Sequence, residues 1–249
     1  MDIAVCIKRV PDTETRIKIE GDGKSIDPSG VKFVMSPYDE IAVEGALRTR
    51  EAVGAGEVTL VTFGDASSAE TLRGGLAMGA DKAVLLKGQA TMDGLAVAKA
   101  LAAEVEASGA PLVLLGVKAA DDDQQQVGPM LATLLGRPCA TAVSNFEMGD
   151  GTITCYREVE GGHETVELTL PAVVTITKGE FEPRYASLKG IMAAKRKPLE
   201  EKDAQQAESR LEVEVLDPPP ARPDGRIVGE GADAVGELVR LLREEAKVL

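Results

Sequence analysis

The chain has 249 residues, enough to bury one substantial core with appendages, so one α/β domain with an extension is expected. Aromatic residues make up 3% of the sequence and tryptophan is absent, which argues against a stacking platform for single-stranded nucleic acid. The formal net charge of −13 argues against nucleic acid as a partner and gives no attraction to an anionic membrane.

Cysteine and histidine usage argues against several kinds of site. Cys6, Cys139 and Cys155 are widely spaced, and Cys6 and Cys139 stand in apolar contexts typical of buried thiols. His163 is the only histidine, so neither a metal site built on histidines nor a Ser-His triad is expected. The N-terminus enters a strand without a targeting pattern, and no apolar run approaches a membrane span. A cytoplasmic protein with no membrane insertion is therefore expected.

The first half of the chain predicts strands that alternate with helices, as in a parallel sheet. The Gly21-Asp22-Gly23 turn predicts a small hairpin over residues 16–27. A cap near Thr91 or Met92–Asp93 is expected for the third helix. The expected strands span residues 3–10, 58–63 and 83–87, and the expected helices span 35–50, 66–78 and 91–108.

The helix expected over residues 35–50 has a well-defined start. Ser36 is the predicted cap, Pro37 takes the first helical position, and Asp39 lies three residues after the cap. Taken locally, these residues are explained by a good helix cap and need no further function.

Residues 111–130 predict a site that organises the rest of the chain. An apolar strand at 112–115 is followed by a polar turn with three aspartates and three glutamines. The apolar spacing from Val127 onward then predicts a helix, and Pro129 restricts its start to residues 125–127. A helix N-terminus at the carboxyl edge of a parallel sheet is typical of an adenine-nucleotide site. The alternative is a capping box formed by Asp123 and Gln126 in a solvated acidic turn.

The alternation continues through a strand expected at 140–146. After it the pattern changes to consecutive strands without helices between them, expected at 152–159, 163–170 and 172–177. An antiparallel hairpin that extends the sheet edge is the simplest explanation. The predicted fold is α/β, with a doubly wound, mostly parallel sheet of the Rossmann-like type that binds an adenine nucleotide. An antiparallel edge hairpin and an extended C-terminal arm are added to this sheet.

Residues 181–198 form a basic stretch that also carries exposed-looking apolar residues, in a strongly acidic protein. This predicts a docking surface for an acidic partner, although lysines that complement a helix dipole would explain residues 195–197. Residues 199–226 are charged and rich in proline, and predict an arm that ends in an amphipathic helix over 232–249. We therefore divide the chain into a nucleotide-binding domain (1–198) and an arm (199–249). The arm would pack on another subunit rather than back on its own domain.

Six segments, in the same order and spacing, resemble the β subunit of electron transfer flavoproteins over nearly the whole chain. They are V-C-I-K-R-V-P at 5–11, S-P-Y-D-E-I-A-V-E at 36–44, L-A-M-G-A-D at 76–81, L-V-L-L-G to Q-V-G-P-M at 112–130, R-E-V-E-G-G at 157–162, and L-P-A-V-V-T to P-R-Y-A-S-L at 170–188.

The resemblance implies a heterodimer in which the α subunit holds most of the FAD and this chain holds a structural AMP. This chain would be an electron carrier, not an enzyme. The AMP contacts implied by position lie in turns at the ends of separate strands: Cys6; Ser36, Pro37, Tyr38 and Asp39; Phe63; and Gly116, Val117, Lys118, Ala119, Ala120, Asp121, Asp122, Asp123, Gln124, Gln125, Gln126 and Val127.

The chain departs from the family pattern at several of these positions. Ser36 stands where the family often has asparagine, and Cys6, Val127 and Pro129 stand where many members have alanine, threonine and glutamine. Without a threonine hydroxyl at Val127, one phosphate contact is in doubt. Val127-Gly128-Pro129 is also similar to the bifurcating branch, whose β subunit binds a second FAD instead of AMP. The three aspartates and the P-R-Y-A-S-L segment favour the AMP branch.

The resemblance also implies that residues 184–193 are a recognition loop for dehydrogenases, with Leu188 as the apolar anchor. The partners it implies are acyl-CoA or other flavin dehydrogenases as donors and a quinone oxidoreductase as acceptor, as in fatty acid oxidation. Ala193 replaces a lysine of some members, so control by lysine modification is not expected here. The implied docking residues are Arg184, Tyr185, Leu188, Ile191 and Met192, with Glu158 facing the α subunit or the mobile flavin domain.

Two unrelated functions fit the sequence less well. A stand-alone ATP-binding stress-type protein would need a glycine-rich phosphate loop after a late strand, and the sequence has none. An ATP pyrophosphatase would need a Ser-Gly-Gly-x-Asp-Ser turn after the first strand, where this chain has Lys-Arg-Val-Pro-Asp.

Overall fold

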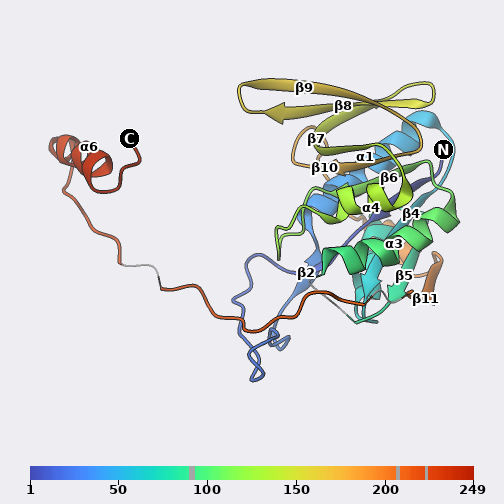
Figure 1. Cartoon of the computed structure of the whole chain (residues 1–249), viewed down its shortest axis with the longest axis horizontal. Coiled ribbons are helices and arrows are strands. Elements are labelled where there is room, and N and C mark those ends of the chain that lie inside the picture. The colour runs from blue at the N-terminus through green and yellow to red at the C-terminus, as the bar shows by residue number, and fades with distance from the viewer. Residues whose placement is uncertain (90–92, 206–207, 222–223) are drawn as a thin grey trace.

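The computed structural model describes residues 1–89, 93–205, 208–221 and 224–249. Figure 1 shows a sheet with helices packed on it, and a long arm that leaves this body. The elements, in chain order, are β1 (Ile3–Cys6), β2 (Arg9–Pro11), β3 (Phe33–Met35), α1 (Pro37–Val53), β4 (Val58–Gly64), α2 (Ser68–Met78), β5 (Lys82–Lys87), α3 (Gly94–Ser108), β6 (Leu112–Gly116), α4 (Val127–Leu135), β7 (Cys139–Met148), β8 (Thr152–Val159), β9 (Gly162–Thr169), β10 (Ala172–Ile176), α5 (Leu188–Ala194), β11 (Leu199–Asp203), a short 3-10 helix (Ala232–Ala234) and α6 (Val235–Glu244).

Within the described residues, nine strands form one sheet in the order β11-β5-β4-β1-β6-β10-β7-β8-β9. Neighbouring strands from β11 to β7 run parallel, whereas β8 and β9 pair in antiparallel fashion. In this register Ile3 lies between Val58 of β4 and Leu112 of β6. The prediction of an α/β protein with a mostly parallel sheet and an antiparallel edge hairpin is confirmed.

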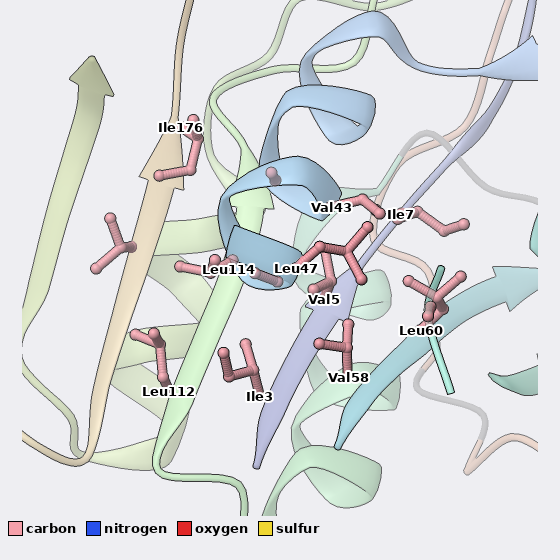
Figure 2. Close-up of a cluster of buried hydrophobic side chains, with 14 of the residues drawn as sticks. Ile3, Val5, Ile7, Val43, Leu47, Val58, Leu60, Leu112, Leu114 and Ile176 are labelled. Atoms are coloured by element: carbon pink, nitrogen blue, oxygen red, sulfur yellow. The ribbon is translucent and has the colours of Figure 1, made fainter. Parts of the chain in front are cut away.

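The core lies on both faces of the sheet because successive side chains of a strand point to opposite sides. Ile3, Val5 and Ile7 face α1 and α2, and Figure 2 shows them beside Val43 and Leu47 of α1. The intervening Ala4 and Cys6 face α3 and α4. Each large apolar side chain buried in this way stabilises the fold by about 1.5–3 kcal/mol. The near-continuous apolar strands are thus explained by burial on two faces.

Strand β10 differs from the prediction, which grouped residues 172–177 with the antiparallel edge. It runs parallel between β6 and β7, where Val173 pairs with Val113 on one side and Cys139 on the other. All five residues of β10 are buried. A short, fully buried strand suits the middle of a parallel sheet, so the chain returns from the edge hairpin to the centre.

The N-terminal region also differs from the prediction. The strand expected over 3–10 is two strands, because the backbone turns away after β1 and β2 pairs antiparallel with β3. The backbone N–H of Lys8 donates to the Asp39 carboxylate and not to a carbonyl of a neighbouring strand. The hairpin expected over 16–27 is reduced to one bridge between Ile19 and Ile26.

The helix starts follow local signals. Pro37 opens α1, and α4 opens at Val127 with Pro129 in its first turn, as predicted. Asp93 caps α3 by accepting from the N–H groups of Leu95 and Ala96 (2.9 and 3.2 Å), while the other predicted cap positions, 91 and 92, lie outside the described residues.

The arm differs from the prediction at both ends. Residues 199–203 form β11 and pair with β5, so the extended part begins after Asp203. The C-terminal helix is shorter than expected and spans Val235–Glu244 as α6.

Between these ends the arm is tied to its own domain. The N–H of Arg210 donates to the Asp93 carboxylate (2.6 Å), and the N–H of Leu216 donates to the Gly23 carbonyl (2.8 Å). Figure 1 shows α6 at the far end of the arm, apart from the sheet and its helices. The apolar residues Val235, Leu238 and Val239 of α6 are exposed.

Candidate functional site

The carboxyl ends of β1 and β6 meet the first turn of α1, as expected for ligand sites in open α/β sheets. We call this region the carboxyl-edge site. It comprises Lys8, residues 36–39 and residues 116–127. The predicted AMP contacts in these ranges come together, and Lys8 joins them.

Asp39 is the residue that connects these segments. It is buried, and its two carboxylate oxygens accept from the backbone N–H groups of Lys8 (2.7 Å) and Gly116 (2.9 Å). Burial raises the pKa of Asp39 to about 7, although these two hydrogen bonds act to lower it. Asp39 therefore joins the ends of two neighbouring strands.

Gly116 allows this close approach. A Cβ atom on Gly116 would lie 2.5 Å from Oδ1 of Asp39 and 2.7 Å from Cβ of Tyr38, distances that real contacts do not reach. The glycine at the end of β6 therefore permits the first turn of α1 to pack against the strand.

Ser36 occupies the N-cap position of α1, but its side chain does not act as the predicted cap. Among the described residues, its hydroxyl makes no capping bond and instead donates to the Lys118 carbonyl (3.4 Å). The backbone carbonyl of Ser36 accepts from the N–H groups of Asp39 and Glu40. Ser36 is fully buried, so it links the start of α1 to the turn after β6.

Two lysines partly neutralise the acidic turn. Nζ of Lys8 bonds to Asp121 (2.8 Å) and Asp122 (2.7 Å), and Nζ of Lys118 bonds to Asp123 (2.8 Å). Burial lowers the pKa of Lys8, but the hydrogen bonds to the two aspartates outweigh it and raise the pKa above its usual value. These pairings reduce the repulsion that three aspartates would exert on a phosphate group.

The turn before α4 has an unusual backbone. Asp123 and Gln125 have positive φ angles of 52° and 56°. Gln126, rather than Asp123, is the N-cap residue of α4, so the predicted capping box is not formed. The Gln126 side chain bonds to Gln124, and it lies 3.1 Å from the position of a Cβ on Gly94. The N-termini of α3 and α4 therefore lie close together at Gln126. The Asp93 carboxylate already caps α3, whereas among the described residues no side chain caps α4, so the positive end of α4 is the one left open.

Cys6 and Phe63 belong to the apolar cluster on the α3 and α4 face of the sheet. The Cys6 thiol is buried among the side chains under α3 and α4, and burial, with a smaller effect of Asp39, raises its pKa to about 12. Phe63 is half-buried near the end of β4, and a Cβ on Gly88 would lie 2.4 Å from its ring.

The predicted docking residues form a second group away from the carboxyl-edge site. Tyr185 is 99% exposed and Leu188 is 84% exposed, and Ile191 and Met192 are also exposed. Glu158 lies separately on the exposed hairpin of β8 and β9, opposite His163. Arg184 differs from its neighbours, because its guanidinium bonds to Glu44 and Glu51 of α1.

Sequence reasoning missed Lys8, Glu44 and Glu51. Lys8 and Glu44 lie inside segments that resemble the family, which could have pointed to them. The partners of Lys8 are 113 and 114 residues away in the chain, and the partner of Glu44 is 140 residues away. No local pattern predicts such pairs.

In the described ranges no cluster of three or more cysteine, histidine or carboxylate side chains has the geometry of a metal site. None of the helices that the structure describes combines the length and apolar character needed to cross a membrane.

Comparison with known proteins places these features in a family. A model of the electron transfer flavoprotein domain matches residues 24–207. The electron transfer flavoprotein β subunits of Bradyrhizobium diazoefficiens and Bacillus subtilis are 44% and 40% identical to this chain over the full length of both proteins. The β subunit of Sus scrofa is 38% identical, over 98% of this chain and 97% of its own. The similarity therefore includes the carboxyl-edge site, the 184–193 loop and the arm.

Proposed function

Because the chain belongs to the electron transfer flavoprotein family as a β subunit, we propose that it holds AMP at the carboxyl-edge site and docks flavin dehydrogenases. It does so as one half of a heterodimer whose α subunit holds most of the FAD. The FAD supplies the electron-accepting chemistry, and this chain supplies structure and recognition. It is an electron carrier subunit rather than an enzyme.

The N-terminus of α4, which lies beside the start of α3 at Gln126, is the observation that carries the AMP proposal. Backbone N–H groups at the start of α4, with Lys8 and Lys118 nearby, suit a phosphate. The carboxylates of Asp121 and Asp122 suit ribose hydroxyls, since a carboxylate has acceptor capacity beyond one lysine contact. Donor groups for the phosphate and acceptor groups for the ribose thus occur in one turn.

The bound nucleotide tests this proposal directly. We expect denatured, purified complex to release AMP, identified by chromatography and mass spectrometry, in addition to the FAD of the α subunit at one per heterodimer. Two FAD molecules per heterodimer and no AMP would instead identify the bifurcating branch. Release of neither nucleotide from this chain would remove the proposed site.

The arm supports the proposed heterodimer. α6 carries an exposed apolar side, which a soluble chain is expected to cover with another surface. We expect co-expression with an α subunit to yield a yellow 1:1 complex. A colourless, monodisperse chain that ignores the α subunit would contradict the assignment.

The 184–193 loop supports the proposed docking of dehydrogenases. One exposed leucine among apolar and basic side chains is a suitable hot spot for a small, short-lived interface. The donors would be acyl-CoA or other flavin dehydrogenases and the acceptor a quinone oxidoreductase, as in fatty acid oxidation. The negative charge of the whole chain and the basic loop together would orient an acidic partner surface toward this loop.

A further inference from the structure

Arg184 is held by two carboxylates of α1. Its Nε and Nη2 bond to Glu44 (2.7 and 3.1 Å), and its Nη1 and Nη2 bond to Glu51 (2.6 and 3.1 Å). The Glu44 side chain is only 3% exposed. Burial raises the pKa of Glu44, but the hydrogen bonds from Arg184 and Arg48 outweigh this effect and hold the pKa below its usual value. Charge-assisted, forked contacts of this kind fix both position and orientation.

Arg48 extends the same attachment to the backbone before Arg184. Its Nε bonds to Glu44 (2.7 Å), and its two terminal nitrogens reach the carbonyls of Glu180 and Glu182 (3.5 and 3.4 Å). Together Arg48 and Arg184 hold residues 180–184 against α1.

The other end of the loop is attached to α2. Nη1 of Arg73 donates to the carbonyls of Ala194 and Lys197 (2.6 and 2.7 Å), and Nζ of Lys197 donates to the carbonyls of Leu76 and Ala80 (3.0 and 2.5 Å). Arg73 of α2 therefore binds carbonyls at the C-terminal end of α5, and Lys197 binds carbonyls at the C-terminal end of α2.

The second half of the 184–193 loop is the start of α5, which packs closely on α2 at Gly190. A Cβ on Gly190 would lie 2.5 Å from the Ala77 carbonyl oxygen, so only glycine permits this contact. The residues between these attachments are the exposed ones, and Tyr185 directly follows Arg184. Polar contacts thus attach the loop to α1 and α2, while its apolar side chains are exposed to solvent.

We propose that Arg184 is a positioning residue: its ion pairs with α1 hold the loop in the shape that presents Leu188 to a protein partner. Arg184 then acts through the loop and does not itself contact the partner. An apolar residue on an ordered loop binds better than one on a mobile loop, because less conformational entropy is lost on docking. This inference rests on the proposed docking function and assigns Arg184 a different role from Leu188.

The alternative is that Arg184 contacts an acidic partner directly, and Glu51→Gln separates the two roles. This variant removes the close ion pair with Arg184 (2.6 Å) and a longer one with Arg50 (4.0 Å), leaves Arg184 charged, and spares the buried Glu44. If Arg184 contacts the partner directly, docking should be unchanged or tighter once Arg184 is released from Glu51. If Arg184 positions the loop, docking should become weaker. Glu57→Gln is the matched control, because Glu57 is similarly exposed (55% against 49%) and forms one ion pair, with Lys82.

The measurements use the complete complex with its α subunit and an acyl-CoA dehydrogenase reduced by its substrate. For Glu51→Gln we expect the half-saturating concentration of the complex to rise about two- to fivefold, with the maximal rate unchanged. Arg184→Lys keeps the charge but loses the forked geometry, so we expect a rise of about tenfold. Hydrogen exchange of amides 185–193 should become faster in both variants and stay unchanged in Glu57→Gln.

The outcomes separate this inference from the docking function. If Leu188→Ala leaves the half-saturating concentration unchanged, the docking function fails, whatever the Arg184 variants do. If Leu188→Ala weakens docking but Glu51→Gln leaves docking or exchange unchanged, or tightens docking, the positioning role is overturned. Weaker docking with faster exchange in Glu51→Gln and normal behaviour in Glu57→Gln supports it.

Discussion

At its first turn α1 contributes Asp39 to the carboxyl-edge site, and further along it contributes Glu44 and Glu51 to the support of the 184–193 loop. Asp39 and Glu51 are separated by about 18 Å along the helix at 1.5 Å per residue. One helix therefore supports both regions that we propose to be functional.

The two regions use their charged side chains differently. At the carboxyl-edge site, buried Asp39 joins strand ends, and the aspartates of the turn are paired with lysines of the same site. In the 184–193 loop, the charges attach the segment to α1 and α2, while Leu188 and Tyr185 face solvent. The first arrangement suits a small polar ligand, and the second suits an apolar protein contact. Variants should therefore damage one region without the other.

The largest expected effect is that of Gly116→Ala. The new Cβ would clash with Asp39 and Tyr38, so the start of α1 must shift, at a cost of about 3 kcal/mol in unfolding free energy. We expect loss of bound AMP, measured by nucleotide content, and lower stability in chemical denaturation. Gly74→Ala is the control, because nothing lies within 4 Å of its Cβ position, and it should stabilise α2 by about 0.5–1 kcal/mol. A Gly116→Ala protein with normal AMP content would contradict the role of this contact.

The converse variant is Leu188→Ala. Removing the exposed anchor should slow electron acceptance from a dehydrogenase about tenfold at sub-saturating concentration. AMP and FAD contents should be unchanged, because Leu188 is exposed and lies outside the carboxyl-edge site. Stopped-flow reduction of the flavin measures the rate. An unchanged rate, or a loss of nucleotide, would break the proposed separation of the two regions.

The pH dependence of stability sharpens the role of Asp39. Its folded pKa of about 7 lies above the unfolded value of about 3.9, so the folded state binds this proton more tightly. The contribution of Asp39 to stability is therefore present below about pH 4 and is lost as the pH rises through about 7. Asp39→Asn removes this titration. The unfolding free energy of the variant should therefore rise relative to that of the parent by about 1 kcal/mol or more as the pH increases from 5 to 8. Denaturation at several pH values measures the difference, and a constant difference would show that Asp39 does not titrate in this window.

The smallest expected effect is that of Val127→Thr. The substitution keeps the side-chain shape and adds a hydroxyl at the first residue of α4. One additional hydrogen bond to phosphate should tighten AMP binding about threefold. Titration calorimetry on nucleotide-free complex measures the affinity, with Val127→Ala as the control that adds no hydroxyl. Equal affinity in the parent and the threonine variant would place the phosphate away from Val127.

Local signals predicted much of the fold. Apolar runs of four to seven residues marked β4, β5, β6 and β10, and Pro37 and Pro129 marked the first turns of α1 and α4. These features depend on residues close together in the chain, such as a proline that fits only the start of a helix. The same local reasoning misplaced β10, because an apolar strand carries no information about which strand lies beside it.

The sequence by itself determined the class of fold, the helix starts, the turns that make up the carboxyl-edge site, and the family. Only the tertiary structure decided that β10 and β11 join the parallel sheet, that Asp39 joins β1 to β6, and that Arg184 is held by α1. The physical reason is the distance along the chain. Strand order and ion pairs join residues that are far apart in sequence, and they form only when the whole sheet and its helices are packed together.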